Sequence, residues 1–490
     1  MTLSRDETLG IVALRRAFRE RRLSPVEMVG DALDRAEKSQ ASINAFTAIC
    51  RDRALEEAKS CEAAFARGEV MGELAGIPVT VKDIIATKGV RTTMGSLDLA
   101  NNVPGADAVS VDRIRKSGAI VIGKTTTPEF ACKQTTNGSL SGVTRNPWNL
   151  DLSPGGSSGG SSASIAAGIG SLSLVTDGGG SARLPAACTG VVGFKPTFGL
   201  VPFDSARDAF SGLGHIGLMA RHIEDIASAL PVMSGPHPGD AASLSRVLSE
   251  RRLPNQSRKP LDGLRIGWRE RLNGEAISKA VLPVIQAALD DLEELGGNVE
   301  PISDSVEPPL PVWQTLQHAI WAERHAHRLS PASKIDPVIV DGIRHAEMLS
   351  ARALQGALHG RTRLFRQVQS WFDRFDAVVT PALARTPLSA EHPGSGNIDI
   401  DGNDAGDIRA AWAPMLGMFT MTGHPAVSLN CGWTEEGLPV GLQFVGRWYE
   451  DTFLLDVARE FQNSNANAAW RMPDYLPGLY KSSREKSHAN

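Results

Sequence analysis

Hydrophobic and polar residues alternate along the chain with two different periods. Residues 275–295 carry apolar side chains every three or four positions, and two glycines follow, which predicts an amphipathic helix ending there. Ser24 and Glu27 have the spacing of a capping box, with Pro25 at the first helical position, so another helix is expected from this point. The first 70 residues are expected to be helical, and further helices are expected in the tryptophan-bearing stretch to about 374 and over 451–462.

Short apolar runs beside glycine or proline predict buried strands. The run "GIPVTVKD" at 76–83 is one, and a helix over "VDRIRK" that ends at Gly118 is expected to lead into a strand over 119–122. Other strands are expected in "LRIGW" (264–268), in "DAVVTPAL" (376–383) and as a pair within 424–446. Because strands and helices alternate throughout, the sequence predicts an α/β protein.

The composition excludes several classes of protein. The chain has 490 residues, of which 42% are hydrophobic, and a formal net charge of −4, so no basic excess points to nucleic acid. The N-terminus lacks the apolar core of a signal peptide, and no apolar run reaches the roughly 18 residues of a membrane span. The five cysteines are scattered without a CxxC pair, so we expect reduced thiols in a cytoplasmic protein, without disulfides or a zinc site.

Two motifs suggest chemistry that their surroundings do not favour. "GAIVIGKT" (118–125) matches a phosphate-binding loop, but its four intervening residues are apolar and predict a strand rather than a pliable cradle. "GGSSG" (155–159) matches a nucleophile elbow centred on Ser157, but "NPWNLDLSP" before it does not predict the buried strand that an elbow requires.

A third stretch, "TDGGGSARLP" (176–185), places Ser181 directly after three glycines. Glycine lets another molecule approach the main chain closely, so Ser181 is either presented to a substrate or part of an ordinary turn. The glycine- and serine-rich region around it (134–200) also carries apolar residues, unlike a flexible linker, and no histidine precedes His215. A serine nucleophile needs a base, and lysine is the alternative to histidine.

Lys82 follows an apolar strand that would carry it into the interior. A free lysine is neutral in roughly 1 molecule in 2,500 at pH 7, but burial lowers its pKa by up to about 3–5 units. Lys82 is therefore either a usable base or an ordinary lysine paired with Asp83 at the end of a strand.

Four segments occur in an order and spacing that closely resemble the amidase signature family of serine hydrolases: "GIPVTVKD", "SPGGSSGGSSAS", "TDGGGSARLPAACTGVVGFKPTFG" and "GLPVGLQFVG". The resemblance extends from about residue 7 to 465. It implies a central twisted mixed sheet of about ten or more strands with helices on both faces, a single domain over 1–490, and no cofactor or metal. Within that domain we expect an N-terminal helical part (1–70), the catalytic motifs (71–232), a surface connection (233–262), a second half (263–470) with a helical insertion at about 303–415, and a tail (471–490).

The resemblance also implies a Ser–cisSer–Lys triad. In this chain the nucleophile falls on Ser181, the bridging serine of the cis peptide on Ser157, and the base on Lys82. The other residues that the resemblance implies are the oxyanion-hole N–H groups of Gly178, Gly179, Gly180 and Ser181, and the supporting residues Ser158, Asp177 and Arg183.

Departures from the family pattern bear on the substrate. Gly178 and Ala182 are smaller than the residues often found there, which predicts a wider site, and Ala131 and Cys132 in "EFACKQTT" are expected to touch substrate by position. "EFACKQTT" and "SGLGHIGLM" also differ from the glutaminase subunit of the tRNA-dependent amidotransferase, which carries "EFAMGSST" and "SSLDQIGPM". These differences favour a free-standing hydrolase of a small aryl or alkyl amide, anilide or carbamate. An esterase or urethanase remains an alternative, as does the glutaminase subunit.

Seven of the nine tryptophans follow residue 300, and they are expected either to line an aromatic pocket or to fill the core. The pair "HAH" at 325–327 has poor helical geometry for a metal and is expected at the surface. A homodimer is common in the family. The only other partner expected is the small amide substrate, without nucleic acid or membrane.

Overall fold

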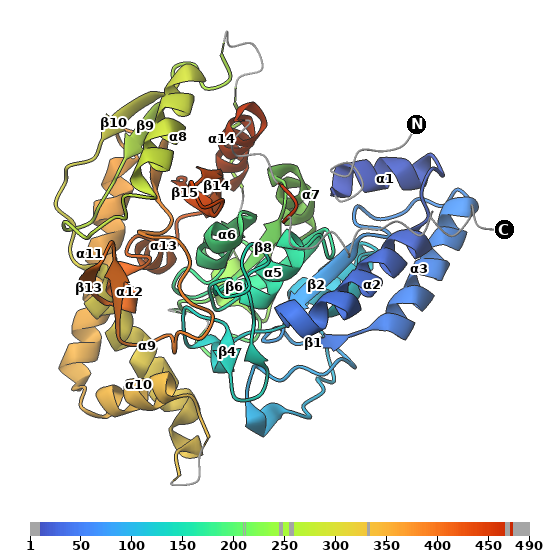
Figure 1. Cartoon of the computed structure of the whole chain (residues 1–490), viewed down its shortest axis with the longest axis horizontal. Helices are drawn as coiled ribbons and strands as arrows, with labels where there is room; N and C mark the ends of the chain where they lie inside the picture. The colour runs from blue at the N-terminus through green and yellow to red at the C-terminus, as the bar shows by residue number, and fades with distance from the viewer. Residues whose placement is uncertain are drawn as a thin grey trace.

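Eleven strands form one mixed sheet through the middle of the protein (Figure 1). The computed structural model describes residues 10–208, 210, 212–244, 248–253, 259–330, 334–465 and 471–473. Eleven strands confirm the expected size of the sheet. In spatial order the strands are β1 (Phe46–Ile49), β3 (Ile120–Thr125), β2 (Pro78–Lys82), β6 (Leu172–Asp177), β8 (His215–Ala220), β7 (Val192–Lys195), β14 (Ala426–Trp433), β15 (Pro439–Val445), β11 (Ala377–Pro381), β9 (Arg265–Trp268) and β10 (Asn298–Pro301).

Fourteen α-helices occur in the described ranges, and short 3₁₀ turns connect some of them. Figure 1 shows the N-terminal helices α1–α3 at the right-hand end and helices α9–α11 at the left. The helices are α1 (Ile11–Arg19), α2 (Pro25–Ile43), α3 (Arg51–Ala66), α4 (Val109–Lys116), α5 (Gly159–Ala166), α6 (Arg183–Thr189), α7 (Ile223–Met233), α8 (Leu282–Glu294), α9 (Pro309–His325), α10 (Pro337–Glu347), α11 (Ala351–Trp371), α12 (Ile408–Ala411), α13 (Leu416–Thr422) and α14 (Asp451–Ser464).

Helices cover both faces of the sheet. On one face, Leu172 and Leu174 of β6 belong to the large apolar core that also takes in residues of α1, α4, α7, α8 and α14. On the other face, Val175 packs with residues of α5 and α6. The alternation along β6 therefore places two helical layers on opposite sides, as expected for the α/β class.

The N-terminal elements differ from the prediction in one respect. Ser24 Oγ accepts the backbone N–H groups of Val26 and Glu27 at 3.0 and 3.3 Å, so the predicted helix start is confirmed. The first 70 residues are not all helical, however, because β1 lies between α2 and α3 and pairs antiparallel with β3. Four residues between two helices are too few for a periodic signal.

Other predicted boundaries shift by a few residues. β3 continues to Thr125, so "IVIGKT" is a buried strand and the phosphate-loop interpretation is excluded. Gly118 has a φ of +86°, which ends the preceding turn. The helix predicted over 275–295 begins only at Leu282, with Pro283 in its first turn. The hairpin of β12 (Asn397–Ile400) and β13 (Asn403–Asp407) was not predicted.

The parallel part of the sheet positions the candidate site. β3, β2 and β6 run parallel, so their carboxyl ends meet at one edge of the sheet. Lys82 is the last residue of β2, and Asp177 is the last residue of β6. Ligands of α/β sheets bind at such carboxyl ends.

Candidate active site

Lys82 and Ser157 lie in direct contact in the interior. Both side chains are completely buried, and Lys82 Nζ donates to Ser157 Oγ at 2.7 Å and to Thr176 Oγ1 at 3.0 Å. The ordinary alternative, a lysine paired with Asp83, is not what the structure has. The Asp83 carboxylate instead accepts the backbone N–H of Thr93 at 3.1 Å.

Ser157 is held by an unusual backbone segment. The peptide bond between Gly156 and Ser157 is cis, and Gly155 has a φ of +80°. A Cβ at residue 156 would lie 2.8 Å from the carbonyl carbon of Gln134, so only glycine fits there. Ser158 then leads into α5, and its Oγ donates to the carbonyl oxygen of Thr176 at 3.4 Å. No strand occurs in the described residues 144–154 directly before this segment, so the elbow interpretation lacks its structural context.

Burial changes the protonation of Lys82. Desolvation lowers the pKa of its ammonium group from 10.5 to about 7, against the attraction of Asp177. Lys124 and Lys195 are also buried, and desolvation lowers the pKa of each to about 7 as well. A lowered pKa therefore does not single out Lys82. Its contact with a serine does, because Lys124 donates to Thr87 Oγ1 at 2.9 Å and Lys195 to a backbone carbonyl at 3.0 Å.

Asp177 fixes the loop that carries Ser181. Its carboxylate accepts the N–H groups of Gly180 at 2.8 Å and Ala182 at 3.2 Å, and both of its oxygens accept hydrogen bonds from Arg183 at 2.9 Å. Burial raises the pKa of Asp177, but the charge and hydrogen bonds of Arg183 outweigh it and hold the pKa well below its usual range. Both side chains are completely buried, so this pair braces the loop from inside.

Two residues from the second half of the chain complete this brace, and the sequence analysis missed both. Thr420 of α13 donates to Asp177 Oδ1 at 2.9 Å, and Gln443 of β15 accepts from Arg183 Nη1 at 2.7 Å. Gln443 is a lone polar residue inside the apolar run "GLPVGLQFVG", and this was a usable signal because a buried amide needs a partner.

The three glycines before Ser181 have different surroundings. Gly180 has a φ of +113°, and a Cβ there would lie 2.7 Å from Leu416. A Cβ at Gly179 would lie 3.1 Å from the indole nitrogen of Trp313, which itself donates to the carbonyl oxygen of Gly178 at 2.8 Å. A Cβ at Gly178 would meet nothing within 4 Å, so a larger residue would fit there.

Ser181 opens onto a cavity of about 600 Å³. Ser157 and Thr176, the two residues that contact Lys82, also line it, as do Ala131 and Cys132 from the segment expected to touch substrate. No histidine is among the described residues that line this cavity. The geometry therefore places Ser181 and Ser157, which contacts Lys82, on the wall of one substrate-sized cavity, and none of the described residues lining it is a histidine.

Of the six late tryptophans that the structure describes, two line the cavity, namely Trp313 and Trp321 of α9. Trp371 and Trp412 are core residues, 1% and 0% exposed. Trp433 packs edge-on against Trp148, Trp448 packs against Phe365, and Trp470 lies outside the described residues.

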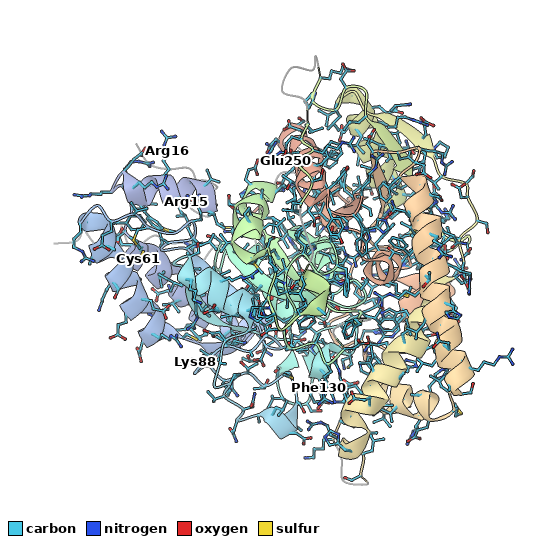
Figure 2. All side chains as sticks on the ribbon, turned by 180° about the vertical axis from the view of Figure 1, so that it is seen from behind. Arg15, Arg16, Cys61, Lys88, Phe130 and Glu250 are labelled. Atoms are coloured by element: carbon cyan, nitrogen blue, oxygen red, sulfur yellow. The ribbon has the colours of Figure 1, made fainter. Side chains whose placement is uncertain are left out.

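Phe130, which the sequence analysis did not single out, also lines the cavity. Figure 2 marks its position in the molecule. Its ring stacks on that of His325, with centroids 4.1 Å apart. The prediction of a surface "HAH" is therefore wrong for His325, which is 7% exposed and packs against the aromatic wall, whereas His327 is exposed. Across the described ranges no cluster of three metal-ligating side chains occurs.

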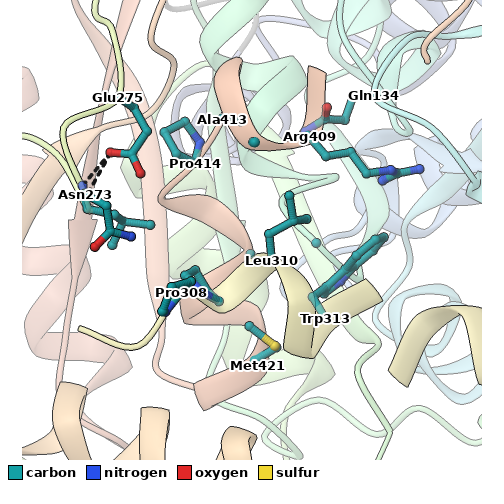
Figure 3. A pocket seen from close by; sticks show the side chains of 15 residues that line it. Gln134, Asn273, Glu275, Pro308, Leu310, Trp313, Arg409, Ala413, Pro414 and Met421 are labelled. Atoms are coloured by element: carbon teal, nitrogen blue, oxygen red, sulfur yellow. Dashed lines mark hydrogen bonds between the residues drawn. The ribbon is translucent and has the colours of Figure 1, made fainter. Parts of the chain in front are cut away.

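A second, smaller cavity of about 170 Å³ lies beside the first. Gly179, Trp313, Gln134 and Arg409 line both cavities. Figure 3 shows Trp313, Gln134 and Arg409 together on one side of the smaller cavity.

None of the described helices is long and apolar enough to cross a membrane.

Comparison with known proteins agrees with this geometry. The profile of the family described as "Amidase" matches residues 27–455. One of the subunits of the glutamyl-tRNA(Gln) amidotransferase of Symbiobacterium thermophilum is 35% identical over 481 residues, covering 93% of this chain and 96% of that protein. The "Acylamidase" of Rhodococcus erythropolis is 31% identical over 448 residues, covering 90% and 92%. The crystal structure of a bacterial aryl acylamidase of the amidase signature family superposes with a TM-score of 0.83 at 27% identity, covering 94% of this chain and 98% of that chain. This chain belongs to the amidase signature family, whose members include enzymes that act on carbon–nitrogen bonds.

Proposed function

We propose that this chain hydrolyses amide bonds through an acyl-enzyme on Ser181, with Lys82 as the base and Ser157 as the proton relay. The observation that carries the proposal is the 2.7 Å contact between the buried Lys82 and Ser157, at the wall of the cavity onto which Ser181 opens. A pKa of about 7 leaves Lys82 neutral in about half of the molecules at pH 7, so it can accept a proton.

The proposed reaction conserves protons at each step. Neutral Lys82 takes the hydroxyl proton of Ser157, which takes the proton of Ser181, and the Ser181 oxygen attacks the amide carbonyl. The proton then returns along the same path to the leaving nitrogen, because an amide nitrogen cannot leave as an anion. Water enters, the relay repeats, and the acid is released with Ser181 restored.

Backbone N–H groups of the glycine loop are proposed to hold the oxyanion. The N–H of Gly180 donates to Asp177, which leaves those of Gly178, Gly179 and Ser181 for the developing charge. Such donors act through preorganisation, and losing one costs about 10²–10³ in rate in other enzymes. We assign Asp177, Arg183 and Ser158 the role of holding this loop and the cis-peptide segment in place.

The substrate is proposed to be a small aryl or alkyl amide, anilide or carbamate. The cavity size and the aromatic wall of Trp313, Trp321 and Phe130 support this class. Glutamine hydrolysis as part of an amidotransferase is the second candidate, and the 35% identity to a chain of the glutamyl-tRNA(Gln) amidotransferase supports it. The acyl-enzyme route would also serve esters.

Labelling with a fluorophosphonate, followed by intact mass and peptide mapping, tests the nucleophile. We expect one adduct on Ser181, none in Ser181→Ala, and strongly slowed labelling in Lys82→Met and Ser157→Ala. Lys124→Met is the matched control, because burial lowers the pKa of Lys124 to about 7 as well, but Lys124 contacts Thr87 rather than a serine. An adduct on Ser157 would overturn the assignment. Ammonia release from glutamine, compared with 4-nitroanilide hydrolysis by the chain alone, separates the two candidate functions.

A further inference from the structure

Arg409 is a cation in the cavity wall without a carboxylate partner. Among the residues that the structure describes, none places a carboxylate oxygen within 4.0 Å of its guanidinium, and its one hydrogen bond there goes from Nη2 to the carbonyl oxygen of Cys132 at 2.5 Å. Asp407 and Asp336 attract the guanidinium only from farther away. A guanidinium carries five N–H donors, so most of them remain for a ligand. Because Arg409 lines both cavities, those donors are close to substrate space.

Two indole rings hold this guanidinium in place. Its central carbon lies 4.9 Å from the ring centroid of Trp313 and 5.8 Å from that of Trp321. Trp313 also bonds the carbonyl oxygen of Gly178, beside Ser181. Aromatic stacking orients a guanidinium without satisfying its donors, so Arg409 is preorganised for an acceptor near the reacting end of the cavity.

Gln134 gives a second, independent indication of a polar ligand. It is 9% exposed and lines both cavities, and its Oε1 atom is buried without a hydrogen-bond partner in the described structure. Gln134 is two residues from Cys132, whose carbonyl Arg409 contacts. A buried amide without partners is costly unless a ligand supplies them, and rotation about its last torsion presents either its oxygen or its NH₂ group.

The other charged side chains along the large cavity do not neutralise the positive charge of Arg409. Lys133 pairs with Asp336 at 2.6 Å, and Arg207 with Glu323 at 2.9 Å, so these cations are already compensated. Arg324 lines the same cavity and adds a further positive charge. The overall charge of the chain is −4, and yet this cavity is lined by four cationic and only two acidic side chains.

We infer that Arg409 and Gln134 form a carboxylate-binding subsite, so that the preferred substrates are amides that carry a carboxylate beyond the scissile bond. A planar carboxylate matches the guanidinium fork and takes a further bond from the Gln134 NH₂ group. The inference rests on the proposed amide hydrolysis, because it names the substrate class of the same site. The carboxylate belongs either to the acyl half or to the amine half of the substrate.

Calorimetry on the Ser181→Ala variant, which cannot turn the ligand over, tests this subsite. One ligand pair is the mono-4-nitroanilide of glutaric acid and the corresponding neutral glutaramide. The other pair is N-pentanoyl-4-aminobenzoate and N-pentanoyl-4-aminobenzamide. We expect the carboxylate of at least one pair to bind about tenfold or more tighter than its neutral partner, since charged hydrogen bonds are about twice as strong as neutral ones. The pair that responds identifies the half that bears the carboxylate.

Variants made in the Ser181→Ala background locate the preference. Arg409→Gln is expected to abolish the ratio of the two dissociation constants, and Gln134→Glu to reverse it. Arg344→Gln, at an exposed position of α10, is the control and should keep the ratio. Equal affinity within both pairs for the parent, or a preference that survives Arg409→Gln, or one that only Arg324→Gln removes, overturns the inference.

Failure of the subsite and failure of the proposed function remain distinguishable. Turnover of the neutral 4-nitroanilide by the chain with Ser181 intact would keep the proposed function even when no carboxylate preference is found. Conversely, a carboxylate preference in binding without turnover of either anilide would keep the subsite and reject the hydrolase.

Discussion

Replacing Thr176 with valine is expected to shift the pH dependence of hydrolysis in a direction that tests Lys82 as the base. Burial lowers the pKa of Lys82 from 10.5 to about 7. Only the neutral amine accepts a proton, so kcat/KM should fall about tenfold per pH unit below pH 7 and be constant above it. An unperturbed lysine would instead be neutral in roughly 1 molecule in 2,500 at pH 7, with activity still rising beyond pH 9.

The size of the shift follows from one hydrogen bond. Thr176 Oγ1 accepts from Lys82 Nζ at 3.0 Å, and valine has nearly the same shape without an acceptor. A hydrogen bond from a charged donor contributes about 1.5–3 kcal/mol and one from a neutral donor about 1 kcal/mol, so valine removes roughly 0.5–2 kcal/mol more from the ammonium form than from the amine. Since 1.36 kcal/mol equals one pKa unit, the pKa of Lys82 should fall by about one unit, and the acid limb with it.

The assay is kcat/KM for a 4-nitroanilide from pH 5 to pH 9. Lys124→Met serves as the control, because Lys124 is buried with a pKa of about 7 but contacts Thr87 rather than a serine. The apparent pKa of the acid limb in the Lys124→Met profile should equal that of the parent, even where the variant is less stable. Two results would refute Lys82 as the titrating base. One is an apparent pKa of the acid limb that stays unchanged or rises in Thr176→Val, and the other is an apparent pKa that shifts in Lys124→Met.

Three further predictions concern the loop around Ser181. Gly178→Ala should keep wild-type thermal stability because its Cβ has open space, whereas Gly180→Ala should lower the Tm by several degrees, since φ is +113° and the Cβ would meet a neighbouring side chain at 2.7 Å. Arg183→Met should lower the free energy of unfolding by about 3–5 kcal/mol in urea titrations, because it leaves the buried charge of Asp177 unpaired; a loss below about 1 kcal/mol would contradict this. Trp313→Phe should lower kcat several-fold through loss of about 1 kcal/mol from the bond to Gly178, and an unchanged kcat would show that this bond does not hold the loop in its reactive shape.

The sequence predicted the parts of the site where a short segment fixes its own geometry. Lys82 ends an apolar strand, and Gly180 has a φ of +113° just before Ser181, so both signals lie within short segments. The strand predicted over 119–122, which continues to Thr125 in the structure, was recognised for the same reason, because its apolar run does not favour a phosphate loop. The helix predicted over 275–295 begins later, at Leu282, since apolar spacing alone does not distinguish packed loop residues before Leu282 from the helix itself.

The substrate wall could not be predicted, because its residues come from segments far apart in the sequence. Gln134, Trp313 and Arg409 share one wall only because α9 and α12 pack against the segment that follows β3. Each residue is unremarkable in its own segment, and Trp371 and Trp412, which follow residue 300 as Trp313 does, lie in the core instead. Within the described structure, Arg409 lacks a carboxylate partner and the Gln134 Oε1 atom lacks a hydrogen-bond donor, and such gaps become visible only when the neighbours are known. Residues whose role depends on local backbone geometry can therefore be predicted from this sequence. Substrate specificity depends on contacts between distant segments, so it must be tested on variants of the residues that line the cavity.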